Sequence, residues 1–223
     1  MVIQSAPRTM NWTKVLLTFL IATFLFFFGF FIGYLTQALL KSSTISIQDT
    51  AKTEILNLET LSMLESQYPC ESYVVDTLTD RLDYVGGLIS TLEERQGKTN
   101  TDVLELKKLY SILEVRHMLL VNDKNKQCNA NYSIFLYFYS NDPTCKTPTD
   151  ETAFVFTYLR RKFDTVRVYS FDKQLNSDLV KALLSHYQID NSCSSVVFDG
   201  KTYNGYPART SFYESLIVNQ SRS

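Results

Sequence analysis

The stretch Ser133-Ile-Phe-Leu-Tyr-Phe-Tyr139 is almost wholly apolar and aromatic. A short run without polar alternation is typical of a strand that is buried on both faces of a sheet. After this strand we expect a turn region over 140–149, helices over 150–163, 177–187 and 211–218, and strands over 166–171, 194–198 and 201–206. Asp199-Gly200 is a hairpin turn signal between the last two strands. The sequence therefore predicts an α/β domain over 129–223.

The order of these elements resembles the thioredoxin fold. The stretch FLYFYSNDPTC (135–145) is similar to the first buried strand of that family and its active-site turn. The stretch HYQIDNSCSSVVFDGKTYNGY (186–206) is similar to the family's approach to its closing hairpin. The resemblance covers roughly residues 131–218, and it implies a thioredoxin-like fold for the C-terminal part of the chain.

The same resemblance locates the candidate site. The family's chemistry uses a Cys-x-x-Cys motif at the start of its first helix and a cis-proline before its third strand. This chain has Asp142-Pro-Thr-Cys145 at the first position and Cys193 at or beside the second. The resemblance implies that Cys145 and Cys193, the candidate catalytic residues, face each other across the site. A structural disulfide is preferred over a redox pair, and two inert buried cysteines are the remaining alternative.

Upstream of this domain, apolar residues recur with heptad spacing in two segments, which is typical of helices that pair as in a coiled coil. The first stripe is Val75, Leu78, Leu82, Val85, Ile89 and Leu92, and the second is Val103, Leu106, Tyr110, Leu113, His117 and Leu120. Gly97 and a polar turn separate the segments, with Asn100 or Thr101 as the N-cap of the second. The sequence predicts an antiparallel helical hairpin over 70–128. Gly86-Gly87 within the first arm indicates a kink or the close approach of another element.

Two cysteines flank this hairpin. Cys70 precedes its first arm and Cys128 follows its second, and an antiparallel hairpin brings those ends together. We therefore predict a Cys70–Cys128 disulfide worth about 4 kcal/mol in the loop-entropy view, with two free thiols as the alternative. His117 is expected to be a hydrogen-bonded core residue, and no metal site or cofactor is predicted. His186 is expected on an apolar face with Leu179, Ala182 and Leu183.

The N-terminal part of the chain contains the apolar run Val15–Leu35, which has no charged residue. As a helix it spans about 30 Å, the thickness of the hydrocarbon core of a bilayer. The sequence predicts a tail over 1–13, a transmembrane helix over 14–40 that contacts lipid, and a helical stalk over 41–69 broken at Tyr68-Pro69. A cleaved signal peptide is the alternative, but the run is long and no convincing cleavage site follows it.

Charge and cysteine placement predict an orientation. Arg8 and Lys14 precede the span, whereas Lys41 and Lys52 follow it diluted by acidic residues, which favours a cytoplasmic N-terminus. All four cysteines lie after the span, as suits an oxidising compartment. We expect a single-pass membrane protein with its C-terminal domain outside the cytoplasm.

The remaining composition narrows the classes of function. The net charge is −1 with acids and bases interspersed, which argues against a nucleic-acid surface. The favoured hypothesis is a degenerate thioredoxin-like domain that binds or scaffolds an envelope protein. The alternative is a membrane-tethered thiol–disulfide oxidoreductase that uses Cys145 and Cys193. A homo-oligomer, formed through the hairpin or through a GxxxG contact of Gly29 and Gly33, is a third hypothesis.

Overall fold

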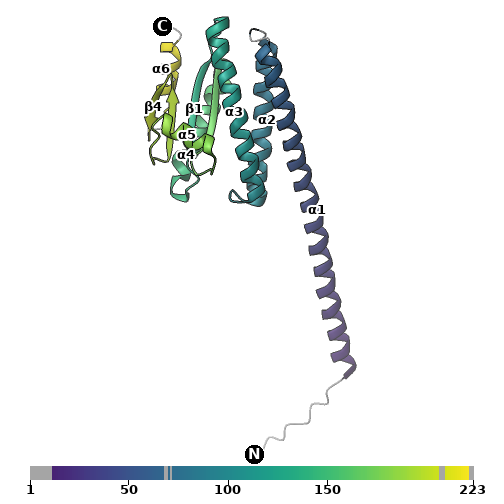
Figure 1. Cartoon of the computed structure of the whole chain (residues 1–223). Coiled ribbons are helices and arrows are strands. Elements are labelled where there is room, and N and C mark those ends of the chain that lie inside the picture. The colour runs from purple at the N-terminus through teal and green to yellow at the C-terminus, as the bar shows by residue number, and fades with distance from the viewer. Residues whose placement is uncertain (1–11, 68–69, 71, 206–208, 221–223) are drawn as a thin grey trace, which may run out of the picture. The chain divides into compact units, whose positions relative to one another are not determined.

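The computed structural model describes residues 12–67, 70, 72–205 and 209–220, without the side chains of 37–44, 65–67 and 72–74. The chain divides into two compact units, Met1–Ser46 and Ile47–Ser223. Its elements in order are α1 (Trp12–Gln67), α2 (Ser72–Gln96), α3 (Thr101–Cys128), β1 (Ser133–Tyr139), the short 3-10 turn η1 (Pro143–Cys145), α4 (Lys146–Lys162), β2 (Val166–Asp172), α5 (Asp178–His186), β3 (Ser194–Phe198), β4 (Lys201–Asn204) and α6 (Thr210–Gln220) (Figure 1). Helices are thus followed by a small sheet with its own helices.

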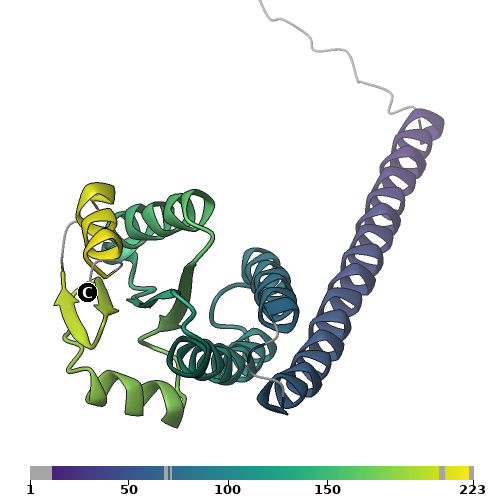
Figure 2. The ribbon, with the colours of Figure 1, turned by 90° about the horizontal axis from the view of Figure 1, so that it is seen from above.

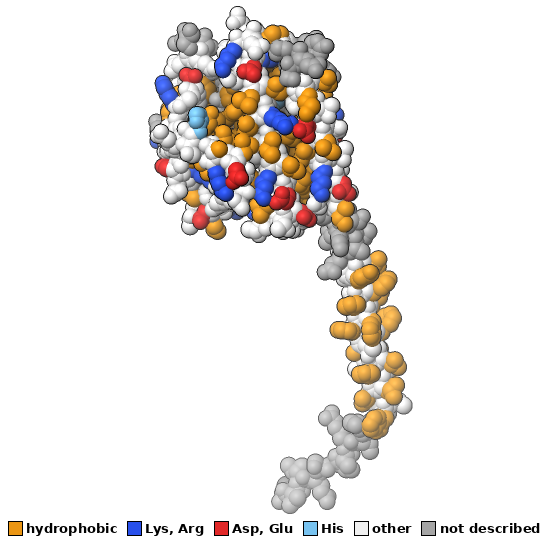
Figure 3. Space-filling model, viewed as in Figure 1, with side chains coloured by type: hydrophobic (Ala, Val, Ile, Leu, Met, Phe, Trp, Pro, Cys, Tyr) orange, Lys and Arg blue, Asp and Glu red, His pale blue; other side chains and the backbone are white. Residues whose placement is uncertain are grey.

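The N-terminal unit contains an apolar helix. The stretch Trp12–Thr36 of α1 is long and apolar enough to cross a membrane, and none of its most apolar window is buried. Apolar side chains project along this part of the helix (Figure 3). A helix that is apolar all round and has no protein neighbour suits lipid contact. The predicted anchor and stalk belong to one continuous helix, and the expected break at Tyr68-Pro69 lies outside the described residues.

The second unit begins with the helical hairpin. The α2 and α3 helices run side by side, joined by the turn after Gly97, whose φ of 91° is the left-handed conformation that ends a helix (Figure 1). The Asn100 side chain caps α3 by accepting hydrogen bonds from the backbone N–H groups of Asp102 and Val103. All six residues of the predicted α2 stripe are buried, and five of them, all but Val75, share a core with Ala51, Ile55 and Leu58 of α1.

The ends of the hairpin meet at the Cys70–Cys128 disulfide, where the two Cα atoms are 5.6 Å apart. This is the pair that the sequence predicts. The covalent link closes the hairpin at the end opposite its turn.

The sheet has the strand order β2-β1-β3-β4. β1 is parallel to β2 and antiparallel to β3, and β3 is antiparallel to β4. Phe135 and Tyr137 of β1 face α4 and α6, whereas Leu136 and Phe138 face α5 and α3 (Figure 2). Both faces of β1 are therefore covered, which explains why its sequence is apolar at consecutive positions.

Two sequence predictions in this region are wrong. α4 begins at Lys146 rather than Asp150, because Pro148 lies in its first turn, where a proline costs no helical hydrogen bond. Asp150, where the sequence predicts the helix to begin, and Thr149 before it therefore lie inside the helix. The apolar face of α5 was also misplaced: His186 and Ala182 are exposed. Val180 is buried instead and packs beside Leu183, Leu184 and Tyr187, because these residues face the sheet.

The glycine pair in α2 marks a close approach. A Cβ atom added at Gly86 would lie 2.9 Å from the Tyr110 hydroxyl oxygen on α3, whereas one added at Gly87 would meet nothing within 4 Å. The space at Gly86 is therefore taken by the second arm of the hairpin.

This difference predicts the effect of alanine at the two positions. Gly87→Ala should stabilise the protein by about 0.5–1 kcal/mol, since alanine is the better helix former. Gly86→Ala should be less stable than Gly87→Ala by about 1–2 kcal/mol, because Tyr110 has to move. Urea unfolding of the full-length chain in detergent micelles measures both. Equal stabilisation by the two substitutions would contradict the close contact.

Candidate functional site

The candidate site lies at the edge of the sheet where the parallel strands β1 and β2 end. Ligand sites of open α/β sheets form at the carboxyl ends of such strands. The chain turns here through Ser140–Cys145 after β1 and through Lys173–Leu175 after β2. The segment before β3 reaches the same edge, because the backbone N–H of Ser140 donates to the carbonyl oxygen of Cys193 at 3.0 Å. Three segments that are distant in the sequence therefore meet.

A disulfide joins two of these segments. Cys145, at the start of α4, is bonded to Cys193, before β3, with their Cα atoms 5.0 Å apart. This is the pair that the resemblance implies. Cys145 is buried and Cys193 is half-buried. A helix N-terminus favours a thiolate, so Cys145 is the sulfur whose ionised form this position would stabilise after reduction.

Lys173 holds the segment that carries Cys193. Its ammonium donates hydrogen bonds to the carbonyl oxygens of Asp190 and Ser192 and to the Ser195 hydroxyl, at 3.2, 2.8 and 2.9 Å. Partial burial lowers the pKa of Lys173 to about 8, and the Asp190 carboxylate acts in the opposite direction. A lysine beside a serine can act as a base for a nucleophile, but Ser195 is only 1% exposed. The contacts indicate that Lys173 positions the segment.

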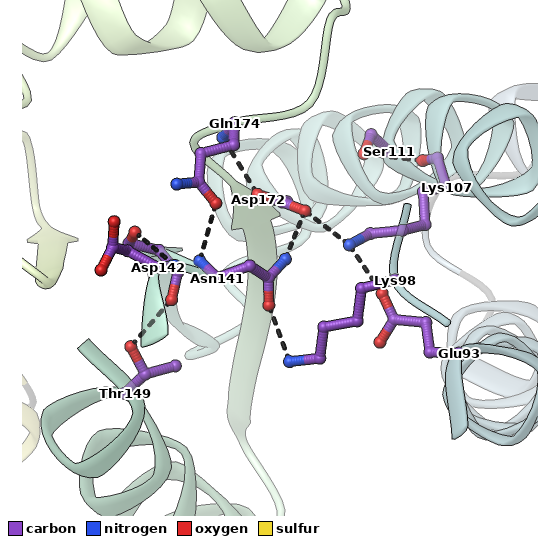
Figure 4. Close-up of polar contacts among 10 residues, drawn as sticks. Glu93, Lys98, Lys107, Ser111, Asn141, Asp142, Thr149, Asp172 and Gln174 are labelled. Atoms are coloured by element: carbon purple, nitrogen blue, oxygen red, sulfur yellow. Dashed lines mark hydrogen bonds and ion pairs between the residues drawn. The ribbon is translucent and has the colours of Figure 1, made fainter. Parts of the chain in front are cut away.

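A buried ionic cluster lies on the other side of the edge (Figure 4). The ammonium of Lys107, on α3, is 2.6 Å from a carboxylate oxygen of Asp172 and 2.8 Å from one of Glu93. Burial by itself would lower the pKa of Lys107, but Tyr139 and the two carboxylates outweigh it and raise that pKa. Lys107 is therefore a cation enclosed between α2, α3 and the end of β2.

Asn141 connects this cluster to the turn after β1. Its side-chain amide nitrogen donates to Asp172 at 2.6 Å, and its side-chain oxygen accepts from Lys98, in the hairpin turn, at 2.8 Å. Its backbone N–H donates to the Gln174 side chain at 3.0 Å (Figure 4). The hairpin turn and the ends of both parallel strands are thus held in one polar network.

The next residue, Asp142, stands where the resemblance places the family's nucleophile. Its carboxylate accepts hydrogen bonds from the backbone N–H and the hydroxyl of Thr144. These hydrogen bonds lower the pKa of Asp142, so the side chain is an anion that caps the turn leading to Cys145.

The two histidines lie away from this edge. His117 is buried; its ring nitrogens lie 2.8 Å from the Tyr169 hydroxyl and 3.3 Å from the Thr79 hydroxyl. Burial lowers the pKa of His117 to about 4, so it is a neutral core residue, as expected. His186 is on the surface. Gly29 and Gly33 have open space beside them.

Sequence reasoning found the cysteines but missed Lys107, Asp172, Glu93 and Asn141. A polar residue at the end of a buried strand was a usable signal for Asp172. Lys107 gave no such signal. The sequence pattern of a lysine beside an apolar helix stripe is the same whether the lysine faces water or another element. Among the described residues, no group of three or more His, Cys, Asp or Glu side chains could hold a metal ion.

The comparisons with known proteins found no matching family model, no matching curated protein and no matching solved structure.

The ionic cluster predicts a strong effect of one lysine and a weak effect of its neighbour. Lys107→Met leaves the buried Asp172 and the half-buried Glu93 without their cation and should destabilise the protein by about 3–5 kcal/mol. The matched control is Lys108→Met, whose pair with Glu105 is exposed and should contribute about 0–1 kcal/mol. Urea unfolding of both variants in micelles provides the comparison. Similar losses for the two would rule out a buried ionic role for Lys107.

Proposed function

We propose that this chain is a single-pass membrane protein that presents a thioredoxin-like domain outside the cytoplasm, where it binds or scaffolds another envelope protein. The observation that carries the proposal is the sheet order β2-β1-β3-β4, with β1 parallel to β2 and antiparallel to β3. This order, with helices on both faces, agrees with the fold that the sequence resembles. The Cys145–Cys193 bond at the carboxyl edge of β1 adds support.

The chemistry of that edge favours binding over redox catalysis. Thiol–disulfide exchange needs an accessible thiolate, and a carboxylate cannot replace it. Asp142 occupies the exposed position of the motif, while Cys145 is only 7% exposed. The network around Asn141 and the contacts of Lys173 hold both ends of the disulfide. These features support a structural bond that keeps the surface around residues 142–148 in one shape.

A second surface supports a protein partner. Leu109, Ile112 and Leu119 of α3 and Leu56 and Met63 of α1 are each at least 40% exposed. Apolar side chains gather over α3 and the elements beside it (Figure 3). A groove of about 290 Å³ on this face is lined by Ser62, Met63, Arg116, Leu119, Leu120 and Asp123. Clustered exposed apolar residues commonly mark protein interaction sites.

The first experiment tests the alternative that the chain is a thiol–disulfide oxidoreductase. We expect the full-length chain in nanodiscs to reduce a disulfide-bonded substrate protein, with dithiothreitol as electron donor, no faster than its Cys145→Ser/Cys193→Ser double variant. Equal rates are expected because the site lacks an exposed nucleophilic thiol. A rate that exceeds the double variant would establish the oxidoreductase alternative instead.

The second experiment tests whether a protein partner binds the apolar face of α3. A photo-crosslinking residue at Ile112, in intact membranes, should capture an envelope protein, and Leu119→Asp should abolish the product by placing a charge in the apolar face. The matched control is the same crosslinker at the exposed Lys201 of β4, which should give no such product. A product that contains only this chain would favour self-association, and no product at Ile112 would contradict a partner on this face.

A further inference from the structure

The outer edge of β2 is covered by the helical hairpin and not by another strand. Among the described residues, β2 pairs with a strand on one side only, and the hairpin lies along its other side (Figure 2). An edge strand leaves backbone N–H groups to be satisfied by something else. Here an oxygen of the Glu114 carboxyl, on α3, accepts a hydrogen bond from the Ser170 N–H at 2.8 Å. A helix side chain thus replaces a neighbouring strand.

Glu114 also has an unsatisfied atom, and so does a residue near it. Glu114 is only 3% exposed, yet its second oxygen, Oε2, has no hydrogen-bond partner among the described residues. Nε of Arg167 also has no hydrogen-bond partner among the described residues. The Arg167 side chain is 10% exposed, and its terminal nitrogens contact Asp76 and the Asp164 carbonyl. A buried polar atom without a partner is costly, so two beside one cavity require an explanation.

Both residues line the same small cavity between the hairpin and β2. It offers about 20 Å³ to the centre of a water-sized sphere. One water molecule needs on the order of 10–15 Å³ by this measure, together with several polar partners. The lining supplies Thr79, Asp83, Tyr110, Glu114, His117, Arg160, Arg167 and Tyr169, with Leu82 and Val168 as its apolar members. The cavity therefore has the size and the polarity for a single water molecule.

We propose that this cavity binds one internal water molecule, which accepts hydrogen bonds from Arg167 Nε–H and from a protonated Glu114, and that the hairpin stays docked on β2 only while Glu114 holds that proton. A water oxygen accepts two hydrogen bonds and can donate two more to the surrounding oxygens. It therefore satisfies both unpaired atoms at once. No other ligand is required.

The charges around Glu114 agree with a neutral acid. Burial raises the pKa of Glu114 to about 8. The Ser170 hydrogen bond and Arg160 act to lower it, and Asp83 acts to raise it. The titratable or charged groups that face the cavity are Asp83 from α2, Tyr110 and His117 from α3, Arg160 from α4, and Arg167 and Tyr169 from β2. Asp83 and Asp76 are ion-paired with the two arginines, so neither cation is left unpaired beside Glu114.

An outer cleft gives the cavity a route to solvent. A cleft of about 460 Å³ between α2 and α4 is lined in part by Asp80 and Arg161, and it shares Thr79, Asp83, Arg160 and Arg167 with the cavity. The Asp83–Arg160 ion pair belongs to both linings. In this proposal, water and protons reach Glu114 past this ion pair.

The direction of the pH effect follows from the two states of the carboxyl. In the unfolded chain Glu114 ionises near pH 4.5, and in the docked hairpin it keeps its proton up to about pH 8. Its stabilising contribution is complete below pH 4.5 and is lost as the pH rises to about 8. Below pH 6.5 the uptake of a proton by exposed His117, whose pKa in the docked hairpin is about 4, opposes this change. Between about pH 6.5 and pH 8 the detachment of the hairpin from β2 should therefore increase by up to about tenfold per pH unit.

Hydrogen exchange of the full-length chain in nanodiscs tests the proton. After correction for the intrinsic exchange rate, protection of α3 and β2 amides in the wild type should fall between pH 6.5 and pH 8, where His117 is neutral in both states, by up to about tenfold per unit. Glu114→Gln keeps an acceptor for Ser170 but cannot ionise, so its protection should not fall over that range. Glu105→Gln, on the exposed side of α3, should behave as the wild type. Equal pH dependence in Glu114→Gln and the wild type would overturn the proposal.

Two measurements on the wild type keep the test decisive if Glu114→Gln does not fold. At pH 6 the infrared spectrum should contain the carbonyl band of a protonated carboxyl, and this band should be absent at pH 9. Its absence at pH 6 would mean that Glu114 is ionised beside Arg167, which contradicts the proton. Nuclear Overhauser contacts between water and the Arg167 Nε proton should be present at pH 6, and their absence would refute the water site.

Discussion

The outer edge of β2 is the constraint on which the rest of residues 47–223 depends. A strand edge that is not paired with another strand must find partners for its polar groups. The α3 helix supplies them from one face: Lys107 binds Asp172, Glu114 binds the Ser170 N–H, and His117 contacts Tyr169. The hairpin is therefore more than a spacer before the sheet. At Ser170 it takes the place of a further strand, because the Glu114 carboxyl accepts the hydrogen bond that a strand carbonyl would accept.

This arrangement makes the hairpin and the sheet depend on each other. The hairpin is closed at one end by Cys70–Cys128 and tied at its turn through Lys98 to Asn141, which follows β1. Between these points it carries a buried cation and a buried carboxyl. Lys107 binds Asp172 and Glu114 binds the Ser170 N–H, so the sheet supplies partners to groups that the hairpin buries. Consistent with this, residues 47–223 form one compact unit.

The same network shapes the edge that carries the cysteines. Asn141 and Asp142 lie in the turn that leads to Cys145, and Lys173 holds the segment that carries Cys193. Each end of the disulfide is thus fixed by polar contacts that originate in different elements. A site built this way offers a defined surface and little freedom for sulfur chemistry, which is why we propose binding as its role.

The elements and their order could be predicted from the sequence alone. The spacing of apolar residues reflects local backbone geometry, so the apolar helix, the hairpin and the strands could be predicted. The pairing of Cys70 with Cys128 followed from their places at the two ends of the hairpin. The pairing of Cys145 with Cys193 needed a family resemblance. Packing between elements set the rest. It selected the buried face of α5 and placed Lys107 and Glu114 in the interior. The start of α4 before Pro148 also became visible only in the folded chain. A charged residue beside an apolar stripe has the same local pattern in water and in a core, and only the element packed against it makes the difference.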